Sequence, residues 1–157
     1  MVDWRRLSDE QLLNQCRVEA FRGPGPGGQK RNKTSSAVRL THTPTGISAL
    51  AGESRSQRQN RTLALRRLRH RIALLVRQPW NADRAPIGLR ISRRSADYPA
   101  VMGAVLDVLA ARDWSVRDSA AAIGTTTAQL VRFLRSDEKL WSEVNTHRRQ
   151  RGLKPLV

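Results

Sequence analysis

Alternating apolar and polar residues mark the first third of the chain. Residues 16–22 and 38–42 alternate in this way, and residues 47–50 return after a turn at Pro44-Thr45-Gly46. A period of two predicts half-buried strands, and a turn between two such runs predicts a hairpin. Residues 32–37, just before the hairpin, are long enough for one or two helical turns. We expect the hairpin to pack beside the first strand in one small sheet.

Helical spacing is found on both sides of this region. Ser8 and Gln11 have the spacing of a capping box, which predicts a short helix after Ser8. A helix start at 54–57 precedes a longer pattern of apolar residues on one face, at Leu65, Leu68, Ile72 and Leu75. This pattern predicts a long helix at about residues 56–77 that covers one face of the sheet.

The rest of the chain is expected to be a linker followed by helices. Residues 78–97 contain two prolines and no clear period, as in a linker. Pro99 predicts a helix that begins at Asp97 or Tyr98, and Ser115 can cap another. Residues 120–134 resemble a helix-turn-helix with Gly124 at the turn, and a last helix is expected at 137–150.

The predicted fold class is therefore α+β. A small mixed β-sheet, made of a strand, a loop and a β-hairpin, is packed by a long basic helix, and a helical, helix-turn-helix-like region follows. The expected divisions are a first domain at 1–77, a linker at 78–97 and a helical basic region at 98–157. That last region either packs as a simple bundle or contacts nucleic acid, and both alternatives stay open.

Charge changes the picture most, because the net charge is +16. Such a field favours an anionic polymer, so nucleic acid is the expected partner. Residues 1–78 hold 16 basic and five acidic residues, and no acidic residue lies between Glu19 and Glu53. No apolar run is long enough for a membrane span or a signal peptide, so we expect a cytoplasmic protein without a membrane partner. The single cysteine, Cys16, excludes an internal disulfide and is expected to be a small core residue.

The long predicted helix carries seven arginines and no acidic residue. Ion pairs within the helix at i,i+4 are therefore impossible, and the guanidinium groups repel one another unless an external anion is present. A solvated helix surface is the ordinary alternative. We favour RNA contact.

Residues 23–29, Gly-Pro-Gly-Pro-Gly-Gly-Gln, join the first strand to the hairpin. Glycines let a backbone approach a partner closely, prolines stiffen it, and an amide both donates and accepts hydrogen bonds. A flexible loop is the ordinary alternative. The glycines at 23, 25 and 28 fit the bare dinucleotide pattern, but no βαβ unit follows, and Gln29 interrupts a P-loop. The three histidines are scattered as surface or hairpin residues, so neither a metal site nor a cofactor is expected.

Three segments together carry a resemblance to a known family: 25–34 (GPGGQKRNKT), 36–47 (SAVRLTHTPTGI) and 53–60 (ESRSQRQN). They resemble the catalytic domain of class I peptide chain release factors, over about residues 16–76. More closely, they are similar to the short release-factor-like proteins that rescue stalled ribosomes as peptidyl-tRNA hydrolases. A GGQ tripeptide alone is common, but the whole set is highly specific.

The resemblance implies a chemical role for the loop. Gly27, Gly28 and Gln29 would enter the peptidyl-transferase centre of the large ribosomal subunit, where the ester that joins the peptide to tRNA is hydrolysed. The glycines leave room in a crowded RNA pocket, the Gln29 N–H stabilises the developing oxyanion, and the Gln29 side chain helps to select water. Neither a protein general base nor a cofactor is required. The residues expected to bind RNA are Arg22, Lys30, Arg31, Lys33, Arg39, Arg55, Arg58, Arg61, Arg66 and Arg69.

The chain also departs from the family pattern. Gly23-Pro24 replaces two serines that are common before the loop, and Lys30-Arg31 replaces a less basic pair. Full-length release factors carry separate domains that read the stop codon, and 157 residues leave no room for them. The resemblance therefore implies codon-independent action. We also expect the protein to be a monomer. Rescue proteins often end in a basic tail, and here a helix-turn-helix-like segment stands instead. The alternative function is a non-enzymatic RNA- or DNA-binding protein that uses both basic regions.

Overall fold

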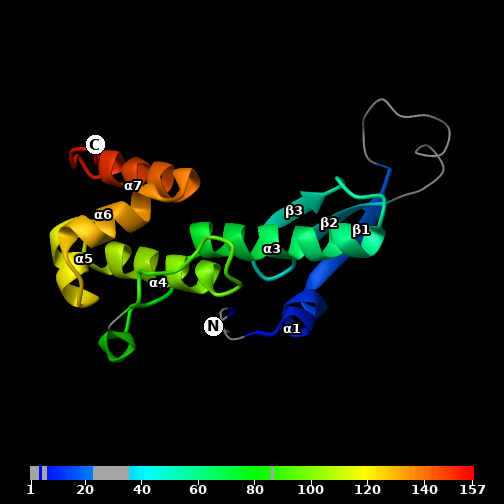
Figure 1. Ribbon diagram of the computed structural model, residues 1–157, viewed down its shortest axis with the longest axis horizontal. Helices are drawn as coiled ribbons and strands as arrows, with labels where there is room; N and C mark the ends of the chain where they lie inside the picture. The colour runs from blue at the N-terminus through cyan, green and yellow to red at the C-terminus, as the bar shows by residue number, and fades with distance from the viewer. Residues whose placement is uncertain (1–3, 5–6, 23–35, 86) are drawn as a thin grey trace. The chain divides into compact units, whose positions relative to one another are not determined.

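A computed structural model describes residues 4, 7–22, 36–85 and 87–157. The chain divides into two compact units, Met1–Ile72 and Ala73–Val157. The first contains α1 (Asp9–Asn14), β1 (Cys16–Phe21), β2 (Ala37–His42), β3 (Ser48–Ala51) and most of α3 (Gln57–Leu75) (Figure 1). The second contains a short 3₁₀ turn (Ala82–Arg84), α4 (Tyr98–Ala111), α5 (Val116–Ala122), α6 (Thr127–Arg135) and α7 (Glu138–Gln150). The predicted α+β class is confirmed.

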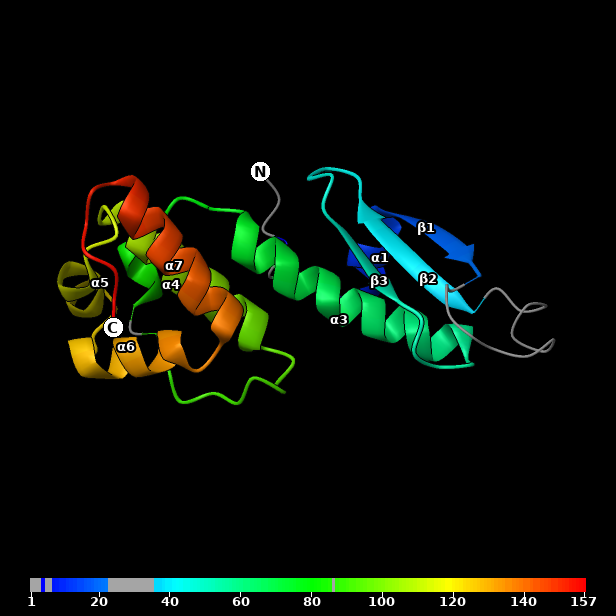
Figure 2. The same cartoon turned by 90° about the horizontal axis from the view of Figure 1, so that it is seen from above.

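The sheet has the strand order β1-β2-β3, and both pairings are antiparallel (Figure 2). The expected mixed sheet is thus refined to an antiparallel one. Val38, Leu40 and His42 on the central strand are buried. Val18 pairs with Leu40 in the register but stays 44% exposed. The predicted strand and hairpin are therefore confirmed, with little burial on β1.

The long helix α3 packs on the sheet through one face. Leu65, Leu68 and Ile72 are buried as the spacing predicted. Leu75 was expected on the same face and is 49% exposed, so that expectation is wrong. Leu75 is the last residue of α3 and belongs to the second unit, so it lies past the part of the helix that belongs with the sheet.

Local capping signals in the sequence are matched by the helix starts. Ser8 and Gln11 form a complete capping box on α1. Ser115 accepts from the backbone N–H of Asp118 at the start of α5, and Thr126 accepts from that of Gln129 at the start of α6. Pro99 lies in the first turn of α4, as expected. These caps satisfy backbone donors that have no partner inside the helix.

The second unit is a set of helices around an apolar core. Met102, Leu106 and Leu109 of α4 are fully buried. The turn between α5 and α6 contains Gly124 with φ of 73°, a left-handed conformation that favours glycine. Part of the expected linker is hydrogen-bonded to this unit, since the Ile87 N–H donates to the Ile123 carbonyl. Within the described part of the chain, no helix is both long and apolar enough to cross a membrane.

Candidate nucleic-acid interface

The predicted catalytic loop is rooted between two neighbouring strands. Phe21 ends β1, Ala37 begins β2, and the two are register partners. The chain between them therefore leaves and re-enters the sheet at the same place. The candidate residues of the loop lie outside the described residues: Gly27, Gly28, Gln29, Lys30, Arg31 and Lys33. Most of the helical turns expected at 32–37 lie outside them as well.

Asn60 fixes the point where the loop re-enters the sheet. Its side chain is completely buried, and its Nδ2 donates to the Ser36 and Ser54 carbonyls, both at 2.7 Å. Its Oδ1 accepts from the Ser54 N–H at 2.9 Å. One amide thus joins α3 to the residue before β2 and to the turn that precedes the helix. The sequence analysis did not assign a role to Asn60, although it lies within the family-like segment 53–60.

A second contact at the loop root is made by Arg39, an expected RNA ligand. Its guanidinium lies 5.3 Å from the centre of the Phe21 ring, within the range of a cation–π interaction. Arg39 and Arg22 are both exposed. Two positive charges therefore stand beside the place where the loop begins and ends.

The arginines of α3 divide into two sets, and the first set holds the fold together. Arg67 donates to the Leu50 carbonyl at 2.7 Å, and Arg71 donates to the Ser48 carbonyl at 2.6 Å. Arg67 also pairs with Glu53, and this side-chain hydrogen bond is the main reason that the pKa of Glu53 lies below its usual value. Both carbonyls belong to β3, so these arginines cover the outer edge of the sheet.

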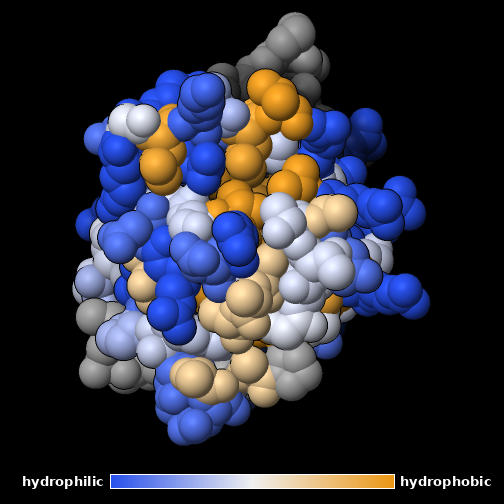
Figure 3. All heavy atoms as spheres, turned by 90° about the vertical axis from the view of Figure 1, so that its left-hand side faces the viewer, coloured by the Kyte–Doolittle hydropathy of each residue, from blue (hydrophilic) through white to orange (hydrophobic). Residues whose placement is uncertain are grey.

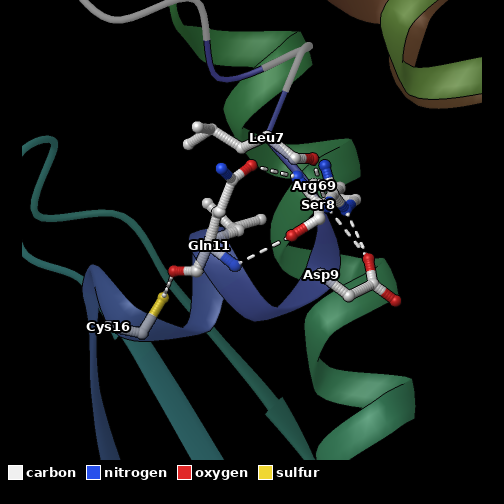
Figure 4. A network of polar contacts seen from close by, with 7 residues as sticks. Leu7, Ser8, Asp9, Gln11, Cys16 and Arg69 are labelled. Atoms are coloured by element: carbon white, nitrogen blue, oxygen red, sulfur yellow. Dashed lines mark hydrogen bonds and ion pairs between the residues drawn. The ribbon is translucent and has the colours of Figure 1, made fainter.

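Arg69 belongs to the same set, although the sequence analysis expected it to bind RNA. Its Nη2 donates to the Leu7 carbonyl and to Asp9 Oδ1, each at 2.9 Å (Figure 4). The Arg69 side chain is only 15% exposed. The structure therefore commits this guanidinium to holding α1 against α3.

The second set of arginines faces outward. Arg58, Arg61 and Arg66 on α3 are exposed, as is Arg55 just before the helix. The side chains of Arg55, Arg58 and Arg61 have no partner among the described residues. A shallow hollow of about 520 Å³ on this part of the helix is lined by Ser56, Arg58, Gln59, Thr62, Leu63 and Arg66. The outward guanidinium groups of Arg55, Arg58 and Arg61 can donate to a phosphate from all their N–H groups, so this face is suited to RNA.

The histidine and cysteine of the sheet have structural partners. The histidines were expected to be surface or hairpin residues, and His42 lies in the hairpin and is buried. Its Nδ1 lies 2.8 Å from Thr45 Oγ1, and its Nε2 lies 3.1 Å from Gln15 Oε1. Burial lowers the pKa of His42. Cys16 is half-buried and donates to the Leu12 carbonyl, and burial raises the pKa of its thiol, which disfavours the reactive thiolate. In the described part of the chain, no cluster of three His, Cys, Asp or Glu residues could hold a metal ion.

Comparison with known proteins identifies the class. Residues 11–91, about half of the chain, match the RF-1 domain. The chain belongs to this family, and the resemblance to the catalytic domain of class I peptide chain release factors is confirmed. The match contains the loop, the sheet and α3.

Individual relatives agree with this assignment. Peptide chain release factor 2 from Pseudarthrobacter chlorophenolicus is 48% identical over 71 residues, which are 45% of this chain and 19% of that protein. Peptide chain release factor 1 from Kineococcus radiotolerans is 49% identical over 70 residues, 45% of this chain and 20% of the relative. Peptide chain release factor 1 from Leifsonia xyli subsp. xyli is 50% identical over 70 residues, with 45% and 19% covered. The chain spans about a fifth of the length of these curated relatives.

Proposed function

We propose that the protein hydrolyses the ester of peptidyl-tRNA in the peptidyl-transferase centre of the ribosome, without reading a codon. The observation that carries this proposal is the family match over residues 11–91, which includes Gly27, Gly28 and Gln29. The aligned segment is about a fifth of each relative. We propose that it carries the hydrolytic step, and that codon reading belongs to the parts of those relatives outside the alignment.

The chemistry assigned to the loop follows from its residue types. A backbone N–H at Gln29 can stabilise the oxyanion that develops when water attacks the ester, and the Gln29 amide can hold that water. Gly27 and Gly28 have no Cβ, so the backbone can approach crowded RNA. The loop begins and ends on adjacent strands, and Asn60 fixes the point where it re-enters the sheet. This arrangement favours a loop that is presented from a rigid base.

Basic residues around the loop are assigned to ribosomal RNA. We propose that Arg22 and Arg39 contact phosphates at the loop root, and that the loop residues Lys30, Arg31 and Lys33 do so further along. The outward face of α3 would hold a second stretch of RNA through Arg55, Arg58, Arg61 and Arg66. The protein would act as a monomer on cytoplasmic ribosomes, since one catalytic loop enters one peptidyl-transferase centre.

A peptide-release assay tests the proposal. Ribosomes stalled on an mRNA that ends in the P site are mixed with the protein, and released peptide is followed over time. We expect Gly28→Ala to lower the release rate by about 100-fold or more, because the added Cβ displaces the oxyanion donor. Gln29→Ala keeps the backbone N–H and should lower the rate because it removes the side-chain amide that holds the water. Gly88→Ala is the matched control, because a Cβ there meets no atom within 4 Å. Full activity of both loop variants would exclude the mechanism.

A further inference from the structure

The helix pair α5–α6 in the second unit presents a basic surface that the proposed reaction does not use. Leu130, Phe133 and Leu134 turn one side of α6 into the core. The exposed residues of α6 are Thr127, Ala128, Gln129, Arg132 and Arg135. No acidic residue lies between Asp118 and Asp137. Hydrophilic side chains cover much of this side of the molecule, with a smaller apolar patch beside them (Figure 3).

The arginines of this surface have no acidic partner among the described residues, and one of them is oriented by an aromatic ring. The Arg135 guanidinium lies 5.0 Å from the centre of the Trp141 ring. Stacking on an aromatic face orients the guanidinium and leaves its N–H edge open to an anion. Among the described residues, Arg117 and Arg132 make no ion pair or side-chain hydrogen bond. Arg148 differs, because it donates to the Trp114 and Lys154 carbonyls and so stabilises the unit itself.

The two helices meet as in a helix-turn-helix. Gly124 forms the left-handed turn, and Thr126 caps α6 directly after it. In DNA-binding pairs of this kind the second helix lies in the major groove and the first crosses the sugar-phosphate backbone. The major groove of double-stranded RNA is too deep and narrow for this, so only the backbone contact applies to RNA. Arg117 is exposed in the first turn of α5, where a crossing helix would meet that backbone. The two helices thus carry three exposed arginines, Arg117 on α5 and Arg132 and Arg135 on α6.

We propose that the α5–α6 surface binds the phosphate backbone of double-stranded ribosomal RNA through Arg117, Arg132 and Arg135. Of the exposed residues in the first turn of α6, Thr127 and Ala128 are too short for bidentate contacts with bases. The Gln129 amide oxygen already accepts from the Thr125 hydroxyl at 2.6 Å, so the surface positions rather than reads a sequence. The choice of ribosomal RNA rests on the proposed function. The surface would give the protein a second hold on the ribosome, apart from the catalytic loop.

The test is a salt titration of binding with the full chain. Fluorescence anisotropy is measured with a duplex RNA of about 16 base pairs, the span of a shape-reading RNA-binding domain, and with a duplex DNA of the same sequence. Arg132→Gln/Arg135→Gln should reduce the slope of log affinity against log salt for RNA by about two, one for each lost phosphate contact. Arg132→Lys/Arg135→Lys should restore most of the slope. Arg112→Gln/Arg149→Gln removes equal charge from the C-cap of α4 and from α7 and should change the slope little.

Two results would overturn the proposal. One is an RNA slope that the Arg132→Gln/Arg135→Gln pair changes no more than the control pair does. The other is that the wild-type protein binds the DNA duplex more tightly than the RNA duplex and that the Arg132→Gln/Arg135→Gln pair abolishes this DNA binding. That result would assign the surface to DNA. The release assay is read separately: the pair should raise the protein concentration needed for half-maximal release and leave the maximal rate unchanged. Failure of the Gln29 mechanism would appear as an unchanged maximal rate in the Gln29→Ala and Gly28→Ala variants, and it would leave the duplex slopes as they are.

Discussion

At the scale of single residues, Asn60 is the clearest link between the fold and the proposed site. Its buried amide makes three hydrogen bonds, and two of its partners are backbone carbonyls of half-buried residues. One of these carbonyls, that of Ser36, belongs to the last residue before β2. A change at Asn60 should therefore affect both stability and the loop root.

We expect Asn60→Ala to lower the free energy of unfolding by about 2–4 kcal/mol, since buried partners would be left unsatisfied. Urea unfolding followed by circular dichroism measures this change. Thr62→Ala, on the exposed side of the same helix, should stay within about 0.5 kcal/mol of wild type. Equal effects of the two substitutions would contradict the role given to Asn60.

His42 gives a pH dependence at the same scale. The Gln15 amide oxygen can only accept, so Nε2 carries the proton of a neutral ring and Nδ1 accepts from the Thr45 hydroxyl. Burial lowers the folded-state pKa below the ordinary value of 6.5, so the unfolded chain binds the proton more readily. Stability should therefore fall as the pH drops below about 6.5. Unfolding free energies of wild type and His42→Gln at pH 7.5 and 5.5 test this: the variant should lose less stability on acidification, and an equal loss would exclude His42 as the cause.

Residue roles could be predicted from the sequence where the partner is close along the chain. Ser8 and Ser115 cap helices through residues three positions away, so their spacing was sufficient. Asn60 and His42 bond to residues 24 and 27 positions away. Such pairs depend on how the helices meet the sheet, which periodicity does not specify. The loop lies outside the described residues, so its geometry stays a prediction.

At the scale of elements, α3 combines two tasks on one helix. Arg67 and Arg71 are four residues apart, an advance of about 6 Å along a helix. Their acceptors, Leu50 and Ser48, are two residues apart, or about 6.8 Å along a strand. This match lets the helix cover the carbonyls of an edge strand that would otherwise be open to another chain. The sequence predicted the helix, but not which arginines turn toward β3.

Substitutions should separate the two tasks. Arg67→Gln and Arg71→Gln should each lower the unfolding free energy by about 1 kcal/mol, because a charge-assisted hydrogen bond at a partly exposed site is lost. Arg58→Gln and Arg61→Gln should leave it within about 0.5 kcal/mol and weaken ribosome binding instead. Thermal melts and ribosome co-sedimentation measure the two effects. The division is wrong if the outward pair destabilises the protein as much as the edge pair does.

At the scale of the whole molecule, charge is the dominant property. The net charge is +16, and both units contribute outward arginines. We expect the affinity for ribosomes to fall by about 10³-fold or more between about 50 and 200 mM salt, as for proteins that neutralise six or more phosphates. Sedimentation of ribosomes at increasing salt gives this dependence. A flat response would mean that the arginines are merely solvated surface.

The central claim is ester hydrolysis that needs no codon. The most direct test compares peptide release by the wild-type protein from three ribosome complexes, with an empty A site, a sense codon or a stop codon. Our account predicts rapid release from the complex with the empty A site, and no gain in rate when a stop codon is present. Release only with a stop codon, or no release from any of the three complexes, would contradict it.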